Sequence, residues 1–222
     1  MEWLSVGSNV SNNLQLINNG MIPFKEYITE TSALHVFDVD DTLVHSDAKI
    51  HVKDKTGNTV KALTPAEFNT HKLHSDHHYD YGEFKSSAVF SKSKPIHKMI
   101  RTINAAQSTT KKNPKNKVII NTARADLDNK DKFLKTLSSH GIKHMDKIHV
   151  HRAGNIPGGD AAQKKLVYIR QHLNKHPYSH VRMYDDSKEN LDAFLGLKHE
   201  YPNTHFHAYH VSGDGTMRKH TN

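Results

Sequence analysis

The stretch HVFDVDDTLVH, residues 35–45, places three carboxylates directly behind a run of apolar residues. Asp38, Asp40 and Asp41 repel one another and resist removal from water, so a chain that needs only a stable fold gains nothing from them. The preceding segment ALHVFDV is a short, nearly continuous apolar run, as a buried parallel strand shows. The sequence therefore predicts a buried strand that ends at a site for an opposite charge.

Apolar runs alternate with amphipathic stretches from residue 117 onward. The predicted strands are KVIINT, KIHVH, HVRMY and THFHAYHV, and the predicted helices between them are NKDKFLKTLSSHG, DAAQKKLVYIRQHL and KENLDAFLGL. Gly141 fits a position just past a helix, and Asp160 fits an N-cap. Strands that alternate with helices at this spacing predict an α/β fold, a Rossmann-like parallel sheet covered by helices on both faces.

The interval between the first predicted strand and residue 117 has a different pattern. KIHVKDKTGNTVKAL predicts a β-hairpin, and in TPAEF we expect Thr64 as N-cap, Pro65 at the first helical position and Glu67 completing a capping box. A helical stripe runs through KPIHKMIRTINAAQ, and the basic stretch TTKKNPKNK then predicts a loop.

The domain organisation follows from these segments. We expect a polar N-terminal leader over residues 1–30 and a single domain over 31–222, with a flap or small cap inserted at about 45–93. The histidines in HKLHSDHHYD, His71, His74, His77 and His78, could bind a transition metal, but a polar loop is favoured because no helical His-x-x-x-His face accompanies them.

The amino-acid composition indicates which kinds of binding partner to expect. Thirty-one Lys and Arg residues against 23 Asp and Glu give a net charge of +8, which favours anionic partners such as nucleotides or nucleic acid. The sequence has no 18-residue apolar run, no secretory signal pattern and no cysteine. We therefore expect a cytoplasmic protein with no membrane partner and no obligate protein partner.

The polar residues that follow the predicted strands are the candidates for chemistry, because ligands of open α/β sheets bind beyond the carboxyl ends of the strands. They are Asp38 to Thr42, Asn121 to Arg124, and Asp185 to Ser187, with Lys164 and Lys165 at the start of a helix. Carboxylate oxygens without His or Cys suit Mg²⁺. Asp38 and Asp185 could hold that ion jointly, while a lysine and a hydroxyl take phosphoryl oxygens.

Four of these stretches occur in a fixed order over residues 34–186: DVDDTL, VIINT, a lysine at 164 or 165, and VRMYDD. In this the chain resembles members of the haloacid dehalogenase-like (HAD) superfamily, whose first motif is DxDx[TV][LV]. The resemblance implies a HAD core that binds Mg²⁺ and reacts through an aspartyl-phosphate. It implies the following roles: Asp38 as nucleophile and metal ligand, Asp40 as general acid/base and backbone metal ligand, Thr122 as phosphate binder, Lys164 or Lys165 as the lysine that steadies nucleophile and phosphate, and Asp185 with Asp186 as metal anchor.

Two of these roles need further argument. In the family, an aspartate at the position of Asp40 goes with phosphatases and phosphomutases, so the chain resembles a phosphatase. Lys165 is favoured over Lys164, since its separation from Asp185 accommodates a helix, a loop and a strand. Further candidates for substrate binding are Thr42, Asn121 and Arg124, although an arginine just after a strand is as often structural.

The expected function is a Mg²⁺-dependent phosphatase acting on a nucleotide or nucleic-acid phosphate. The inserted region leaves little room for a large cap, and minimal-cap members of the family often act on macromolecules, including phosphorylated nucleic-acid ends. In its small cap the chain resembles the HAD phosphatases of large tailed phages. A small-metabolite phosphatase and a catalytically silent nucleic-acid-binding module remain the alternatives.

Overall fold

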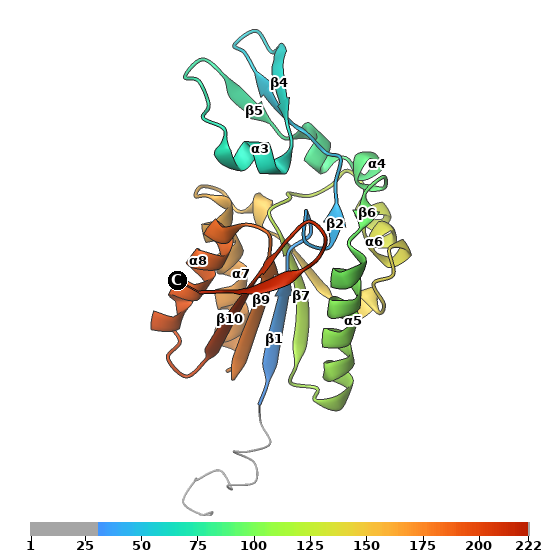
Figure 1. The fold of residues 1–222 in the computed structure, drawn as a ribbon, viewed down its shortest axis with the longest axis vertical. Coiled ribbons are helices and arrows are strands. Elements are labelled where there is room, and N and C mark those ends of the chain that lie inside the picture. Colours follow the sequence, from blue (N-terminus) through green and yellow to red (C-terminus); the bar gives the residue numbers. More distant parts are fainter. Residues whose placement is uncertain (1–30, 222) are drawn as a thin grey trace, which may run out of the picture. The chain divides into compact units, whose positions relative to one another are not determined.

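The computed structural model describes residues 31–221, in which a six-stranded sheet has the order β11-β10-β9-β1-β7-β8 (Figure 1). The strands are β1 (Ala33–Phe37), β7 (Lys117–Thr122), β8 (His149–Arg152), β9 (His180–Asp185), β10 (His205–Val211) and β11 (Met217–His220). The first five are mutually parallel, which confirms the predicted strands. The short edge strand β11 runs antiparallel to β10 and was not predicted from the sequence.

Strand β1 lies at the centre of this sheet, between β9 and β7. All five of its residues are buried, and Val36 lies in register with Ile119 on one side and Met183 on the other. A continuous apolar run is what a strand buried on both faces requires. The carboxylates that follow β1 are therefore held at the middle of the sheet.

Helices cover both faces, as expected for this fold class. Helices α7 (Ala161–Lys175) and α8 (Lys188–Gly196) pack on one face, and α5 (His97–Lys112) and α6 (Lys130–Ser139) pack on the other (Figure 1). The first face buries Leu34, Val36, Ile119, Leu166, Ile169, Leu191 and Phe194, and the second buries Phe37, Ile120, Met99, Ile103, Phe133 and Leu137. The protein is thus an α/β fold with a Rossmann-like, mostly parallel sheet.

Capping residues set the helix boundaries. The Asp160 side chain accepts a hydrogen bond from the Gln163 backbone at the start of α7, and Gly141 follows α6 with φ of 99°.

The loop predicted at TTKKNPKNK is partly wrong, because α5 continues through Lys112. The hydroxyls of Thr109 and Thr110 donate to carbonyls one turn back, so these residues are accommodated in the helix.

The inserted region forms a small α/β structure. Strands β2 (Val44–His45) and β6 (Lys94–Pro95) pair at its base. Residues 46–93 lie between them and are called the cap below. The cap contains a three-stranded sheet of order β4-β3-β5, with β3 (Ile50–Lys53), β4 (Thr59–Leu63) and β5 (His78–Asp80), and the helices α3 (Pro65–Thr70), η1 (Gly82–Lys85) and α4 (Ser87–Phe90).

Two predictions for the cap are confirmed. Strands β3 and β4 form the expected hairpin, and Thr64 and Glu67 form the expected capping box, with the Thr64 amide donating to Glu67 Oε2 at 2.7 Å. The histidines of residues 71–78 lie between α3 and β5 and at the start of β5; within residues 31–221 they do not form a group of three that could share one metal ion. The remaining helices of residues 31–221 are the short η2 (Met145–Lys147), η3 (Ala153–Asn155) and η4 (Leu197–His199).

The leader predicted over residues 1–30 lies outside the described residues. Among the helices of residues 31–221, none combines the length and the apolar character needed to cross a membrane.

Candidate active site

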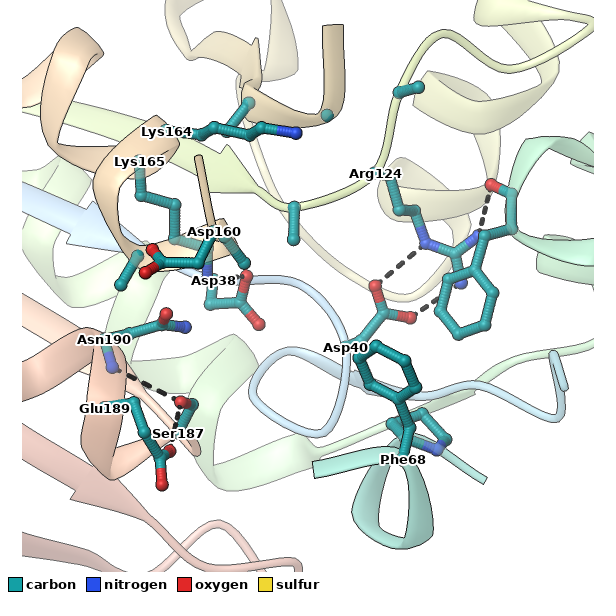
Figure 2. A pocket seen from close by; sticks show the side chains of 18 of the residues that line it. Asp38, Asp40, Phe68, Arg124, Asp160, Lys164, Lys165, Ser187, Glu189 and Asn190 are labelled. Atoms are coloured by element: carbon teal, nitrogen blue, oxygen red, sulfur yellow. Dashed lines mark hydrogen bonds and ion pairs between the residues drawn. The ribbon is translucent and has the colours of Figure 1, made fainter. Parts of the chain in front are cut away.

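A lysine bridges two carboxylates at the carboxyl edge of the sheet. Lys165 Nζ donates to Asp38 Oδ1 at 2.6 Å and to Asp185 Oδ2 at 2.7 Å. Asp38 follows β1, and Lys165 lies in the first turns of α7 (Figure 2). Asp185 ends the adjacent strand β9. All three side chains are buried. Of the two candidate lysines, Lys165 is the one that reaches the carboxylates, while Lys164 lies on the pocket wall.

Neighbouring amides hold this group in place. Asn121 at the end of β7 donates from Nδ2 to the Lys165 carbonyl at 2.9 Å, which fixes the start of α7 against the sheet. Asp185 Oδ1 accepts from the Ser187 backbone at 3.0 Å and from Asn190 Nδ2 at 2.9 Å. Asn190 was not predicted from the sequence, and its only signal is its place in the first turn of the helix that follows the paired aspartates.

Asp38, Asp185 and Asp186, three of the four metal ligands expected from the sequence, form a candidate metal-ligating group. One carboxylate oxygen from each lies within 4.8 Å of the other two, and Asp186 also faces the Thr42 hydroxyl at 3.5 Å. The fourth expected ligand, the backbone of Asp40, stays a prediction. A cluster of carboxylate oxygens without His or Cys fits a hard cation such as Mg²⁺. The residues present therefore fit the ion that the sequence resemblance implies.

The electrostatics of the cluster show a shortage of positive charge. Burial, with the neighbouring Asp185 and Asp40 adding to it, raises the pKa of Asp38 to about 7 although Lys165 opposes the shift. Burial and then the charges of Asp185 and Asp38 raise the pKa of Asp186 to about 8. Burial acts to lower the pKa of Lys165, but its two carboxylate partners outweigh it and raise that pKa. One ammonium does not neutralise three carboxylates, and a bound cation would.

A tight turn separates Asp40 from Asp38. Asp41 has φ of 53°, in the left-handed region that Asp tolerates better than most residues, and the amides of Leu43 and Val44 donate back to the Val39 carbonyl. The chain therefore leaves the strand direction immediately after Asp38. As a result the two carboxylates face different cations (Figure 2).

Arg124 is the cation that holds Asp40. Its Nε and Nη2 donate to the two oxygens of Asp40 at 2.9 and 2.6 Å, its Nη1 donates to the Phe84 carbonyl at 2.8 Å, and Nη2 also donates to Ser46 Oγ at 2.9 Å. The guanidinium lies over the rings of Phe84 and Phe90, 4.6 and 4.9 Å from their centroids. Arg124 thus joins the end of β7, the Asp40 carboxylate and the cap.

The other predicted contact residues are buried. Thr42, Asn121 and Thr122 have no exposed surface, and the Thr122 hydroxyl accepts from the Arg124 backbone at 3.1 Å. None of the three lines the pocket, whereas Arg124 does. That Thr122 binds phosphate and that Thr42 and Asn121 contact substrate stay predictions.

A pocket of about 880 Å³ opens between this edge of the sheet and the cap. Its core side includes Asp38, Asp40, Lys164, Lys165 and Asp186, and its cap side includes Ile50, Pro65, Phe68, Tyr81, Phe84 and Lys85.

Gly154 on η3 supports the loop that carries Arg124. A Cβ atom at Gly154 would lie 2.5 Å from both the Ala123 carbonyl oxygen and the Ala125 amide nitrogen. Only glycine permits this approach, and no sequence pattern predicts the need for glycine at this position.

No family model matches the chain, and no curated protein matches it in sequence. Among solved structures it is similar to the HAD domain of the effector protein Lem4 from Legionella pneumophila, with a TM-score of 0.46 and 14% sequence identity, over 82% of this chain and 88% of that chain. A likeness this distant carries no conclusion about activity.

Proposed function

We propose that the protein is a HAD-type, Mg²⁺-dependent phosphohydrolase that forms an aspartyl-phosphate on Asp38. The observation that carries this proposal is the buried Lys165 that bridges Asp38 and Asp185 inside a cluster of three carboxylates. A carboxylate at the end of a central strand, held by a lysine and facing an open pocket, is placed to attack phosphorus. Bound Mg²⁺, held by Asp38, Asp185 and Asp186, would supply positive charge for the carboxylates and the incoming phosphate.

The nucleophile has one oxygen available. Asp38 Oδ1 is taken by Lys165, and Oδ2 has no hydrogen-bond partner among residues 31–221. In the first step this oxygen bonds to phosphorus, the ester P–O bond breaks, and the leaving alkoxide takes a proton from the Asp40 carboxyl. In the second step water attacks phosphorus, Asp40 takes the water proton, and the bond between phosphorus and Asp38 breaks to release phosphate.

Asp40 can serve as acid and base only when one of its oxygens leaves Arg124, because both are occupied by that guanidinium here. Arg124 also contacts the cap, so a movement of the cap is the event that would free the carboxyl. The proton-transfer role of Asp40 is therefore linked in this proposal to the position of the cap.

The proposed substrate is a nucleotide or nucleic-acid phosphate. The net charge of +8 and the lysines of the pocket favour an anionic substrate with more than one phosphate or with a polyanionic backbone. A small-metabolite phosphatase is the second candidate, since the cap leaves a bounded pocket rather than a flat surface.

Phosphate release, measured with and without Mg²⁺ for wild type and Asp38→Asn, tests the proposal. The substrates are an aryl phosphate, sugar phosphates, nucleoside monophosphates and phosphorylated oligonucleotides. Asp146→Asn is the matched control, because Asp146 is exposed on η2 and away from the pocket. Release that needs both Mg²⁺ and Asp38 is the expected result. Release that survives Asp38→Asn contradicts the assignment of Asp38 as nucleophile. No release from any substrate contradicts the proposal as a whole and favours the binding-module alternative.

A further inference from the structure

The cap presents a group of aromatic side chains that the proposed chemistry does not use. Phe68 on α3 packs edge-to-face against Tyr79 of β5 and Tyr81, with ring centroids 4.8 and 5.8 Å apart. The Tyr79 hydroxyl is 2.9 Å from His71 Nδ1, which fixes the ring that supports Phe68. All of these residues lie within residues 68–81, where the chain returns from α3 to β5, and β5 pairs with β3.

Two of these rings face the pocket. Phe68 and Tyr81 line the same cavity as Asp38 and Asp40, whereas Tyr79 does not. Figure 2 shows Phe68 projecting from α3 on the side of the pocket where Asp40 lies. Tyr81 is 42% exposed, and its hydroxyl has no hydrogen-bond partner among residues 31–221.

The hydrophobic core of the cap does not explain both rings. That core is made of Ile50, Val52 and Leu63, and the partly buried Phe68 packs against it. Tyr81 is not part of it. Large aromatic rings that remain open to a pocket offer flat apolar surface to a ligand, and stacking on such surface suits a nucleobase.

The charged residues of the same pocket agree with a nucleotide. Lys85 on the cap side and Lys164 on α7 both line the cavity, and neither forms an ion pair within the described residues. The acidic side chains outside the metal-ligating group are already engaged: Asp160 caps α7, and Glu189 accepts from the Ser187 hydroxyl at 2.9 Å. The cavity of about 880 Å³ lies in the size range of pockets that bury ligands larger than a sugar phosphate.

We propose that Phe68 and Tyr81 form a base-stacking subsite, so that the ligand is a phosphorylated nucleotide whose base lies against the cap while its phosphate reaches Asp38. This proposal depends on the proposed function in one respect, the placement of the phosphate at Asp38. Its own evidence is the pair of pocket-facing rings. The nucleotide can be free or the terminal residue of a nucleic acid, since both carry the same base and phosphate.

Binding and turnover are measured separately. Calorimetry on Asp38→Asn with Mg²⁺ compares thymidine 5′-monophosphate, a 5′-phosphorylated oligothymidylate and deoxyribose 5-phosphate, which lacks a base. We expect both base-bearing ligands, or one of them, to bind about 10-fold more tightly than deoxyribose 5-phosphate. Adding Phe68→Leu or Tyr81→Leu removes that difference and leaves binding of deoxyribose 5-phosphate unchanged. Val60→Ala, at an exposed cap residue outside the pocket, changes neither.

Each outcome decides a separate point. Equal affinity for ligands with and without a base, or an equal loss for both in Phe68→Leu and Tyr81→Leu, overturns the subsite and leaves the rings a structural role in the cap. Base-dependent binding without any phosphate release from wild type supports the subsite and overturns the proposed function. Tighter binding of the oligonucleotide than of the mononucleotide assigns the subsite to nucleic-acid ends, and the reverse order assigns it to free nucleotides.

Discussion

Replacement of Arg124 by methionine tests the link between Asp40 and the cap. Methionine keeps the unbranched stem and much of the volume of arginine, but it removes the charge and all the donors. The side chain of Arg124 is 1% exposed and that of Asp40 is 16% exposed, so the ion pair lies mostly out of water. Arg124→Met therefore leaves Asp40 with neither a cation nor full hydration.

The structure sets the size of the effect. Removal of one partner from a buried ion pair costs about 3–5 kcal/mol, and the remaining exposure of Asp40 places this case near the lower end. The Phe84 carbonyl and the Ser46 hydroxyl also lose a donor, and a lost hydrogen bond costs about 1 kcal/mol. We expect the free energy of unfolding to fall by about 4–5 kcal/mol.

Urea unfolding followed by far-ultraviolet circular dichroism measures this change. The double variant Asp40→Asn with Arg124→Met should recover much of the loss, because it removes the uncompensated carboxylate. Arg101→Met, at an exposed position on α5, is the matched control and should change stability by less than about 0.5 kcal/mol.

Two results would refute the reasoning about Arg124. The first is a loss below about 1 kcal/mol, which would mean that the pair with Asp40 is hydrated in solution. The second is a double variant no more stable than Arg124→Met alone, which would assign the loss to packing against Phe84 and Phe90 instead of to charge.

Three further predictions concern stability. Lys165→Met leaves two buried carboxylates without their ammonium, so urea unfolding should show a loss of about 3 kcal/mol or more that Mg²⁺ partly restores; an unchanged midpoint contradicts this. Gly154→Ala forces a Cβ against loop backbone and should cost about 1–3 kcal/mol in thermal unfolding, whereas Gly196→Ala, with nothing within 4 Å, should not destabilise. The pKa of Asp38 is raised from 3.8 to about 7 and that of Asp186 from 3.8 to about 8, so the folded state holds protons that the unfolded chain has lost. Stability without metal should therefore fall as pH rises from about 4 to about 8, and Mg²⁺ should raise the melting temperature more at pH 8 than at pH 5; a pH-independent melting temperature contradicts this.

Local sequence patterns account for much of the fold and for the central part of the site. The apolar run of β1 predicts a strand buried on both faces, and the carboxylates after it mark the end of that strand. The spacing from Lys165 to Asp185 allows a helix, a loop and a strand, and the structure places Lys165 against Asp185 by that path. Both inferences use only residues that are neighbours in sequence or are separated by one regular connection.

Contacts between distant segments were not predictable in the same way. Strand β11 has the sequence MRKH, with no apolar run, and it is a strand because β10 offers an open edge. Glycine is required at position 154 because η3 contacts the loop after β7, and no sequence pattern around Gly154 predicts that contact. The three-residue strand β5 likewise depends on its pairing with β3. The positions of Phe68 and Tyr81 at the pocket could therefore not be predicted from the sequence.

The turn at Asp41 explains why two aspartates of one motif can have different tasks. In a regular strand, residues 38 and 40 share a face, and a single cation could serve both. The turn instead directs Asp38 to Lys165, which it shares with Asp185, and Asp40 to Arg124, which binds both of its oxygens. Negative charge therefore remains uncompensated on the Asp38 side, where Asp186 adds to it, and is matched on the Asp40 side. A cation that enters the pocket is drawn to Asp38, the proposed nucleophile, while Asp40, the proposed acid/base residue, stays paired with an arginine that also binds the cap.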